Sequence, residues 1–417
     1  MIILYNIFRH LYKAGISIAS NWNGKAKKWV EGRQDWQNNL NQNWKSSSAD
    51  FAVWMHCASL GEFEQGRPII EKIKFEYPDS KILLTFFSPS GYEIRKNYEL
   101  ADLIMYLPFD SEENAKTFLD FINPQLAIFV KYDFWHFYLL ELKHRKIETI
   151  LVSGIFRSSQ PFFTWWGTFH RNMLHNFTHL FVQNIESKEL LNKIGFGKQT
   201  TVAGDTRFDR VLAIAQQWKP VEQIEQFIDN NKKILVAGST WKEDENLLSE
   251  WFKENEKEWQ LIIAPHEIKA ENISRLKILF PTAICFSEID LNRSDKNSGS
   301  CLIIDNIGYL SKLYHYGTLC FVGGGFNSSG HHNILEAAVY GKCVITGPYY
   351  LKFKESVELK KMGASFTVED IKQLMKLMQT INIKASGRIA ALYVEENSGA
   401  TNVIYNWLQE KRLFTKA

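Results

Sequence analysis

The sequence has few cysteines, and they are not clustered. Five cysteines, an odd number, are widely spaced among 417 residues. Zinc sites and disulfide frameworks need cysteines in pairs at defined spacings, so neither is expected. The sequence has no HExxH motif and no acidic calcium loop, and the neighbouring His331 and His332 lack partners at ligand spacing. We therefore expect reduced, buried cysteines, no bound metal and no cofactor.

An excess of charge of one sign is also lacking. Lysine and arginine number 49 against 46 aspartates and glutamates, a formal net charge of +3, and no arginine-rich tract occurs. This balance argues against nucleic acid as a partner. Long apolar runs are missing too, because Arg9 and Lys13 interrupt the apolar amino end well short of the roughly 20 residues that a spanning helix needs. We expect neither a membrane-spanning helix nor a cleaved signal peptide.

The first 20 residues have the pattern of an amphipathic helix. One side of this helix would carry the apolar residues Ile3, Leu4, Ile7, Phe8, Leu11, Gly15 and Ile18. A basic segment with Trp22 and Trp29 follows, a mixture typical of helices that lie on anionic lipid headgroups. We expect residues 1–35 to associate with a membrane surface. The alternative is a helix that packs on the body of the protein.

A second aromatic segment occupies residues 161–174. It contains Phe162, Phe163, Trp165, Trp166 and Phe169, more aromatic side chains than an ordinary loop carries. We expect this segment either to line a groove for acyl chains or to form part of the core.

The order of predicted elements indicates two α/β domains. The chain is longer than one hydrophobic core usually supports. Strand-like and helix-like segments alternate throughout, which indicates parallel sheets. We expect one Rossmann-like domain over residues 36–215 and another over 216–417, with the final helix, near 396–411, crossing back onto the first. Ligands of two such doubly wound sheets would bind at the carboxyl ends of the strands, in a central cleft that both domains face.

The most informative motif is a glycine-rich join between a predicted strand and a predicted helix. The strand, near Thr318 to Val322, ends at three glycines, and a polar loop then leads to the helix NILEAAVYGK. Glycine lets a ligand approach the backbone, and the start of a helix offers free N–H groups, so the join suits an anionic nucleotide. The alternative is that the glycines only tighten the turn. The many hydrogen-bonding side chains around them favour a ligand site.

Several other motifs also follow predicted strands. These motifs are HCASLGE (56–62), FFSPSG (86–91), GDTRFD (204–209), AGST (237–240) and APHE (264–267). Because the carboxyl ends of parallel strands meet at one edge of a sheet, each domain would gather its motifs at one edge.

Taken together and in this order, these motifs resemble those of one family, the 3-deoxy-D-manno-octulosonic acid (Kdo) transferases of lipopolysaccharide assembly. HCASLGE and the GGGFNSSGHHNILE stretch carry the most specific part of the resemblance, which covers nearly the whole chain. The resemblance implies an inverting, metal-independent glycosyltransferase of the GT-B fold. It would move Kdo from CMP-Kdo to a lipid A precursor, peripherally bound at the cytoplasmic face of the inner membrane of the Gram-negative envelope.

The resemblance and the strand-end positions together assign roles to individual residues. Glu62 matches the family's base, which takes the proton of the acceptor hydroxyl; the alternative is that it caps the following helix. The residues expected to bind the donor are Ser239, Thr240, His266, Gly324, Gly325, Asn333 and Glu336. The residues expected to bind or position the acceptor are His56, Ser59, Gly61, Arg157 and Arg207.

This chain departs from the family at three places. Ala264 precedes Pro265 where the family commonly has an arginine, Trp241 follows AGST where it has a histidine, and Asp133 stands in a segment where it has a glutamate. Arg157 or Lys242 could supply the missing donor contact. The alternatives to a Kdo transferase are another GT-B transferase of envelope glycolipids that uses a UDP- or ADP-sugar, and a membrane-bound scaffold without catalytic activity.

Overall fold

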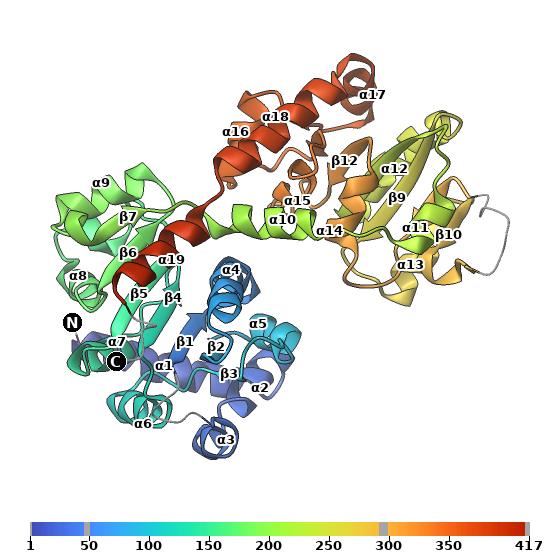
Figure 1. Ribbon diagram of the computed structural model, residues 1–417. Helices are drawn as coiled ribbons and strands as arrows, with labels where there is room; N and C mark the ends of the chain where they lie inside the picture. Colours follow the sequence, from blue (N-terminus) through green and yellow to red (C-terminus); the bar gives the residue numbers. More distant parts are fainter. Residues whose placement is uncertain (1, 46–50, 292–298, 413–417) are drawn as a thin grey trace. The chain divides into compact units, whose positions relative to one another are not determined.

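The computed structural model describes residues 2–45, 51–291 and 299–412 of the chain. They divide into two compact units (Figure 1). The first unit comprises residues 1–210 and 398–417, and the second comprises 211–397. The first crossing between the units falls inside helix α10 (Thr206–Gln216), a few residues before the boundary expected from the sequence. The last helix, α19 (Ala400–Glu410), is part of the first unit and packs on α4 (Leu60–Glu76).

The first unit is built on a seven-stranded parallel sheet in the order β3-β2-β1-β4-β5-β6-β7. Its strands are β1 (Ala52–Cys57), β2 (Lys81–Phe86), β3 (Leu103–Tyr106), β4 (Leu126–Val130), β5 (Glu148–Gly154), β6 (His179–Val182) and β7 (Thr200–Val202). The order reverses direction between β1 and β4. Loops that follow these two strands therefore lie at the switch point, where open α/β sheets bind ligands.

Both faces of this sheet are covered, which explains why its strands read as continuous apolar runs. In β1, Ala52 and Trp54 belong to the core on one face, whereas Val53, Met55 and Cys57 belong to the core on the other. The helices of this unit are α1 (Ile2–Ala19), α2 (Gly24–Glu31), α3 (Trp36–Asn43), α4, α5 (Pro89–Arg95), α6 (Glu112–Ile122), α7 (His136–His144), α8 (Thr168–Leu174), α9 (Ile185–Lys193) and α19.

The second unit repeats the scheme with a parallel sheet in the order β10-β11-β9-β8-β12-β13-β14. Its strands are β8 (Lys233–Thr240), β9 (Trp259–Pro265), β10 (Ala283–Cys285), β11 (Cys301–Ile303), β12 (Leu319–Val322), β13 (Val344–Thr346) and β14 (Ser365–Thr367). The helices are α11 (Glu222–Phe227), α12 (Lys242–Asn255), α13 (Ala270–Leu279), α14 (Leu310–Leu313), α15 (Leu335–Ala338), α16 (Lys354–Lys361), α17 (Ile371–Thr380) and α18 (Ile383–Glu396). Here the switch point lies between β8 and β12.

The helix expected after the glycine-rich loop is much shorter than the apolar spacing predicts. Only α15, of four residues, forms there. The chain turns at Gly341, whose φ of +67° lies in the left-handed region that favours glycine. This correction matters for function, because a helix this short has little macrodipole with which to bind an anion.

Helix α1 packs on the first unit by its polar side. The Tyr5 hydroxyl donates to the buried carboxylate of Asp110, and Arg9 Nη1 donates to the Asp110 carbonyl oxygen at 2.8 Å. The Tyr5 ring also contacts Phe169 of α8, with ring centroids 5.5 Å apart. The apolar residues of α1 are left on the outside, and Leu4, Phe8 and Leu11 are each more than 60% exposed. Among the helices in the described residues, none is both long and apolar enough to cross a bilayer.

Candidate functional site

The first unit presents Glu62 at the carboxyl end of β1. Ser59 occupies the N-cap position of α4, and its hydroxyl donates to the Glu62 carboxylate. In a capping box the glutamate would accept the backbone N–H of the N-cap residue, but here the described contact is with the serine hydroxyl instead. Glu62 is half-buried, and Gly61 beside it is exposed. The turn therefore holds a carboxylate in one orientation without burying it.

His56 lies beneath this turn and is fully buried. Its Nδ1 is 2.8 Å from the Thr85 hydroxyl, and its Nε2 is 3.0 Å from the indole Nε1 of Trp135 and 2.8 Å from Asp133 Oδ2. Nε2 accepts from Trp135 only when it carries no proton, and it donates to Asp133 only when it does. In either state His56 ties β1 to the loop after β4. The histidine thus positions that loop and does not itself face outward.

Arg157, which follows β5, meets a residue that the sequence did not single out. Its Nη1 donates to the hydroxyl of Tyr132 at 3.3 Å, and Tyr132 follows β4. Burial raises the pKa of Tyr132, and the Glu62 carboxylate adds a smaller push in the same direction. The signal that could have found Tyr132 is its place two residues beyond a strand at the switch point.

Arg207 is paired inside its own motif. Its Nε donates to Asp205 Oδ2 at 2.9 Å, and its backbone N–H donates to the other carboxylate oxygen. Asp205 also accepts from Gln65 of α4, at 3.2 Å. The GDTRFD motif therefore joins α10 to α4, and the charge of Arg207 is balanced within the protein.

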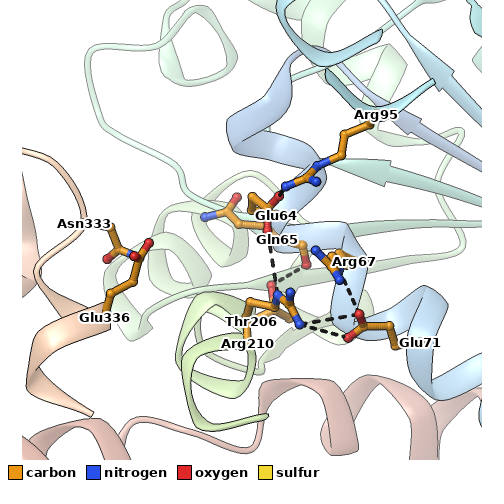
Figure 2. Close-up of polar contacts among 9 residues, drawn as sticks. All are labelled: Glu64, Gln65, Arg67, Glu71, Arg95, Thr206, Arg210, Asn333 and Glu336. Carbon is orange, nitrogen blue, oxygen red and sulfur yellow. Dashed lines mark hydrogen bonds and ion pairs between the residues drawn. The ribbon is translucent and has the colours of Figure 1, made fainter. Parts of the chain in front are cut away.

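Charged residues of α4 form a network with α5 and α10 (Figure 2). Arg67 Nε donates to Glu71 at 2.8 Å, Arg95 Nη2 donates to Glu64 at 2.7 Å, and Arg210 Nη1 reaches Glu71 at 3.4 Å. The Thr206 hydroxyl adds a hydrogen bond to the Gln65 carbonyl at 2.5 Å. Sequence reasoning missed this network. Its contacts join the helix that carries Glu62 to α5 and α10.

Strained backbone occurs in each sheet at the edge formed by the carboxyl ends of the strands. Lys131 follows β4 with φ +63°, and Ser153 in β5 and Ser239 in β8 both have φ +52°. Non-glycine residues adopt the left-handed region at a cost, and such residues concentrate at functional sites. All three lie near the carboxyl ends of strands; β4 and β8 border a switch point, and β5 is the neighbour of β4.

In the second unit, Ser239 and Thr240 end β8. The Thr240 hydroxyl donates to Glu245 at 3.0 Å, and the same buried carboxylate pairs with Arg275. The hydroxyl of Thr240 is therefore already engaged within the protein. Ser239 is almost fully buried in its strained conformation.

The glycine-rich loop packs tightly against both neighbouring strand ends. A Cβ added to Gly323 would come within 2.5 Å of the Ser239 carbonyl oxygen, and one added to Gly325 within 2.5 Å of the Gly347 nitrogen. Packing alone thus explains these two glycines. Gly324 has φ +91°, and its N–H donates to Asp244 Oδ2 at 2.8 Å.

Asp244 is a buried carboxylate under this loop. It also accepts the Trp241 N–H at 2.8 Å, and burial raises its pKa to about 6. Because the Gly324 amide is bonded to Asp244, it is not directed at a ligand in this structure. The carboxylate instead joins the loop after β12 to the turn after β8.

Asn333 and Glu336 lie side by side before and within α15 (Figure 2). Asn333 Nδ2 donates to Glu336 Oε1 at 3.3 Å, and Asn333 Oδ1 accepts the Leu335 N–H. His266 is stacked on Trp241, with ring centroids 4.4 Å apart. The His332 ring is 4.6 Å from His266, and burial lowers the pKa of His332 to about 4. Three rings from three loops thus meet at this edge.

Among the described residues, no group of three or more histidine, cysteine, aspartate or glutamate side chains has the geometry of a metal site. The five cysteines are buried and unpaired.

Comparison with known proteins gives consistent relatives. Residues 31–210 match the family described as 3-deoxy-D-manno-octulosonic-acid transferase (kdotransferase). Over 356 residues the chain is 29% identical to the 3-deoxy-D-manno-octulosonic acid transferase of Aquifex aeolicus, covering 83% of this chain and 89% of that protein. It is 26% identical over 372 residues to a bifunctional glycosyltransferase/methyltransferase of Fusobacterium nucleatum. That match covers 86% of this chain but only 57% of the relative's length.

Solved structures show the same fold. A UDP-GlcNAc 2-epimerase of Neisseria meningitidis is 15% identical with a TM-score of 0.58, covering 86% of this chain and 100% of that chain. A glycosyltransferase of Rickettsia africae is 16% identical with a TM-score of 0.55, covering 88% of this chain and 100% of that one. The expected fold class, two doubly wound parallel-sheet domains of the GT-B type with an amino-terminal helix, is confirmed.

Proposed function

We propose that this glycosyltransferase moves Kdo from CMP-Kdo to a lipid A precursor. The premise is that residues 31–210 are a domain of the Kdo transferase family and that 83% of the chain aligns with a Kdo transferase. One observation carries the proposal. The family match contains the whole seven-stranded sheet of the first unit and the turn after β1 in which Ser59 holds Glu62.

The chemistry needs a base and a site for the leaving group. The acceptor hydroxyl attacks the ketosidic carbon of Kdo as the bond to the CMP phosphate breaks, through an oxocarbenium-like transition state. Glu62 takes the proton of that hydroxyl, and the configuration at the ketosidic carbon inverts. Ser59 positions the carboxylate, while His56 and Asp133 position the neighbouring loop. Arg157 lies on the acceptor side, and Gly61 leaves room for the acceptor.

We assign the donor to the second unit. Asn333 and Glu336 are adjacent and polar at the start of α15, which suits the phosphate and the ribose hydroxyls respectively. His266 is exposed and offers a donor for an anionic oxygen. Ser239, Thr240, Gly324 and Gly325 shape the wall of the site. Thr240 and Gly324 were expected to bind the donor directly. Their hydrogen-bond donors are bonded to Glu245 and Asp244, so we assign them to the wall of the site instead.

We also propose that the protein binds the cytoplasmic face of the inner membrane peripherally. The polar side of α1 is used in contacts with Asp110, so its apolar side is exposed, and Trp165 in the second aromatic segment is 91% exposed. Exposed apolar side chains of this size usually mark a binding surface. Lys25, Lys27 and Lys28 follow α1 and suit anionic headgroups.

The direct test is to incubate the full chain with enzymatically generated CMP-Kdo and a tetra-acylated lipid A precursor, with and without EDTA, and to weigh the products by mass spectrometry. We expect the mass of the acceptor to rise by one or more Kdo residues in both reactions. No mass increase in either reaction would refute the proposed activity.

A second test distinguishes this activity from a transferase that uses UDP-sugars. We expect CMP and CTP to raise the melting temperature of the protein and UDP to leave it unchanged, because a ligand stabilises the folded state only when it binds that state. The reverse pattern would favour a UDP-sugar donor. If neither nucleotide binds, a scaffold without catalytic activity becomes the better explanation.

A further inference from the structure

The loops after β4 and β5 bring together Tyr132 and Arg157. The proposed reaction does not fully explain the role of either side chain. The two strands are neighbours in the parallel sheet, so their carboxyl ends lie side by side. Arg157 Nη1 donates to the Tyr132 hydroxyl at 3.3 Å. This contact holds a cation and a phenol together beside the switch point of the first unit.

The Arg157 guanidinium has no carboxylate partner among the described residues. The other described hydrogen bonds of Arg157 are made by its backbone: its N–H donates to the Gln160 side chain, and its carbonyl oxygen accepts the Gln160 N–H. The side chain is exposed. Arginine presents a planar set of N–H donors that matches carboxylate and phosphate oxygens, so most of this donor set is available to a ligand.

The Tyr132 hydroxyl complements this cation. It accepts the hydrogen bond from Arg157, which leaves its own proton to be donated. Among the described residues no acceptor for that proton is found. An anion placed against the pair would therefore receive an O–H bond from the phenol and N–H bonds from the guanidinium, and bonds of this charge-assisted kind are the strong ones.

The backbone supports a site at this point. Lys131, directly before Tyr132, has φ +63°, and Ser153 at the end of β5 has φ +52°. The Lys131 N–H donates to the Val152 carbonyl oxygen at 3.0 Å, which joins the two strained strand ends. Strain of this kind persists where the surrounding structure holds a residue in a required place.

We propose that Tyr132 and Arg157 form an anion subsite beside Glu62 that binds a phosphate monoester on the acceptor sugar. The inference rests on the proposed function. Both residues lie in the same unit as Glu62, which takes the proton of the acceptor hydroxyl, so the anion belongs to the molecule that carries this hydroxyl. A phosphate monoester has three terminal oxygens, enough to accept from both side chains at once. The subsite would orient the reacting hydroxyl toward Glu62.

The kinetic test compares the wild type with Tyr132→Phe, Arg157→Gln and the double variant, using the phosphorylated acceptor and the same acceptor after phosphatase treatment. We expect each single variant to raise the acceptor KM by about tenfold or more while kcat and the donor KM stay within about twofold. Removing the phosphate should cost the wild type a similar factor and the double variant little. Lys198→Gln, at an exposed lysine elsewhere in the first unit, is the matched control and should change neither constant.

Two results would overturn the proposal. One is an acceptor KM that the three variants leave unchanged. The other is a rise in the donor KM instead, because the anion would then be the carboxylate of the donor sugar. Circular dichroism and the melting temperature of each variant check that it is folded.

A binding measurement without donor separates this inference from the proposed transfer. Detergent micelles containing the phosphorylated or the dephosphorylated glycolipid are titrated with the full chain, and binding is followed by microscale thermophoresis. We expect wild-type protein to prefer the phosphorylated glycolipid by about tenfold and the double variant to have no preference. Preference without transfer would refute the proposed function alone. Transfer without preference would refute the subsite alone.

Discussion

At the scale of single residues, the functional groups are defined by the few atoms they contact. Glu62 is held by a serine hydroxyl and stays half-buried, whereas Asp110 and Asp244 are buried and have their pKa raised to about 6. A carboxylate that must accept a proton from a substrate needs access as well as orientation. Of these three, Glu62 alone combines both.

Replacing Glu62 tests its role as base. We expect Glu62→Gln to lower kcat for Kdo transfer by about 10²–10⁴-fold, because glutamine keeps the shape but cannot take the proton. Stabilisation by CMP should remain, since the donor residues lie in the other unit. Glu113→Gln, at an exposed carboxylate on α6, is the control and should keep full activity. A Glu62→Gln variant with normal kcat would assign the carboxylate to capping α4.

The buried carboxyl group of Asp110 should make the stability of the protein depend on pH. Burial raises its folded-state pKa from 3.8 to about 6 against the opposing contacts of Tyr5 and of two backbone N–H groups. A carboxyl whose pKa is raised on folding contributes stability that is complete below about pH 4 and is lost as the pH rises through about 6. The difference amounts to about 3 kcal/mol in the free energy of unfolding.

The measurement compares urea unfolding of the wild type and Asp110→Asn at several pH values. From pH 4 to pH 7 the wild type should lose stability relative to the variant, which has no group to ionise there. Subtracting the two curves removes the contributions of other titrating groups. A difference that does not change over this range would mean that Asp110 titrates normally in the folded protein.

At the scale of elements, α1 shows how the direction of a helix face is decided. Its polar residues Tyr5 and Arg9 are bound to the loop that carries Asp110, so the apolar face is left exposed. The helix does pack on the body of the protein, as the alternative expected, but it does so by its polar side. The energy of burying that face therefore remains available for a lipid surface.

Substituting the exposed face tests this surface. We expect a variant with Leu4→Ser, Phe8→Ser and Leu11→Ser to float with anionic liposomes at least about tenfold less than the wild type, since each side chain loses about 1.5–3 kcal/mol of burial in lipid. The melting temperature should hardly change, because these side chains are exposed. Phe75→Ser, at an exposed residue of α4, controls for the loss of any surface aromatic.

A chain lacking residues 1–20 should behave like the triple variant in flotation. Equal flotation of the wild type, the triple variant and the shortened chain would remove α1 from the membrane surface and leave Trp165 and the lysines after α1 as the contacts.

At the scale of the whole molecule, the chain passes between the two units twice, after Arg210 and after Asn397. Asp209 secures both passages on the side of the first unit. Its carboxylate accepts the N–H groups of Gly399 and Thr401, at 2.5 and 2.7 Å, and the Thr401 hydroxyl at 2.7 Å. It therefore caps the start of α19 from the neighbouring α10.

Removing this cap should loosen the last helix. We expect Asp209→Ala to cost about 1–2 kcal/mol of stability, as loss of a helix N-cap does, and to speed proteolysis near residue 398. The matched control is Asp370→Ala in the second unit. The Asp370 carboxylate caps α17 by accepting the Gln373 N–H. That control should lose similar stability without faster cleavage near 398. Equal cleavage of both variants would mean that Asp209 has no special part in securing α19.

The sequence by itself determined the class of the fold and most positions of the strand-end motifs, because continuous apolar runs and the alternation of strands and helices depend on near neighbours. The family resemblance, drawn from motifs in order, is confirmed over residues 31–210. The predicted length of α15 was wrong, because apolar spacing does not show where a glycine in the left-handed region turns the chain.

Only the tertiary structure decided which distant residues meet. Tyr132 and Arg157 are 25 positions apart and become partners because β4 and β5 are neighbours in the sheet. Asp244 accepts a hydrogen bond from the N–H of Gly324, which is 80 positions away in the sequence. Asp209 accepts one from the N–H of Thr401, which is 192 positions away. Such contacts follow from strand order and chain crossings, which no local pattern of residues encodes, so the partners of buried and charged groups emerge only when the sheets are assembled.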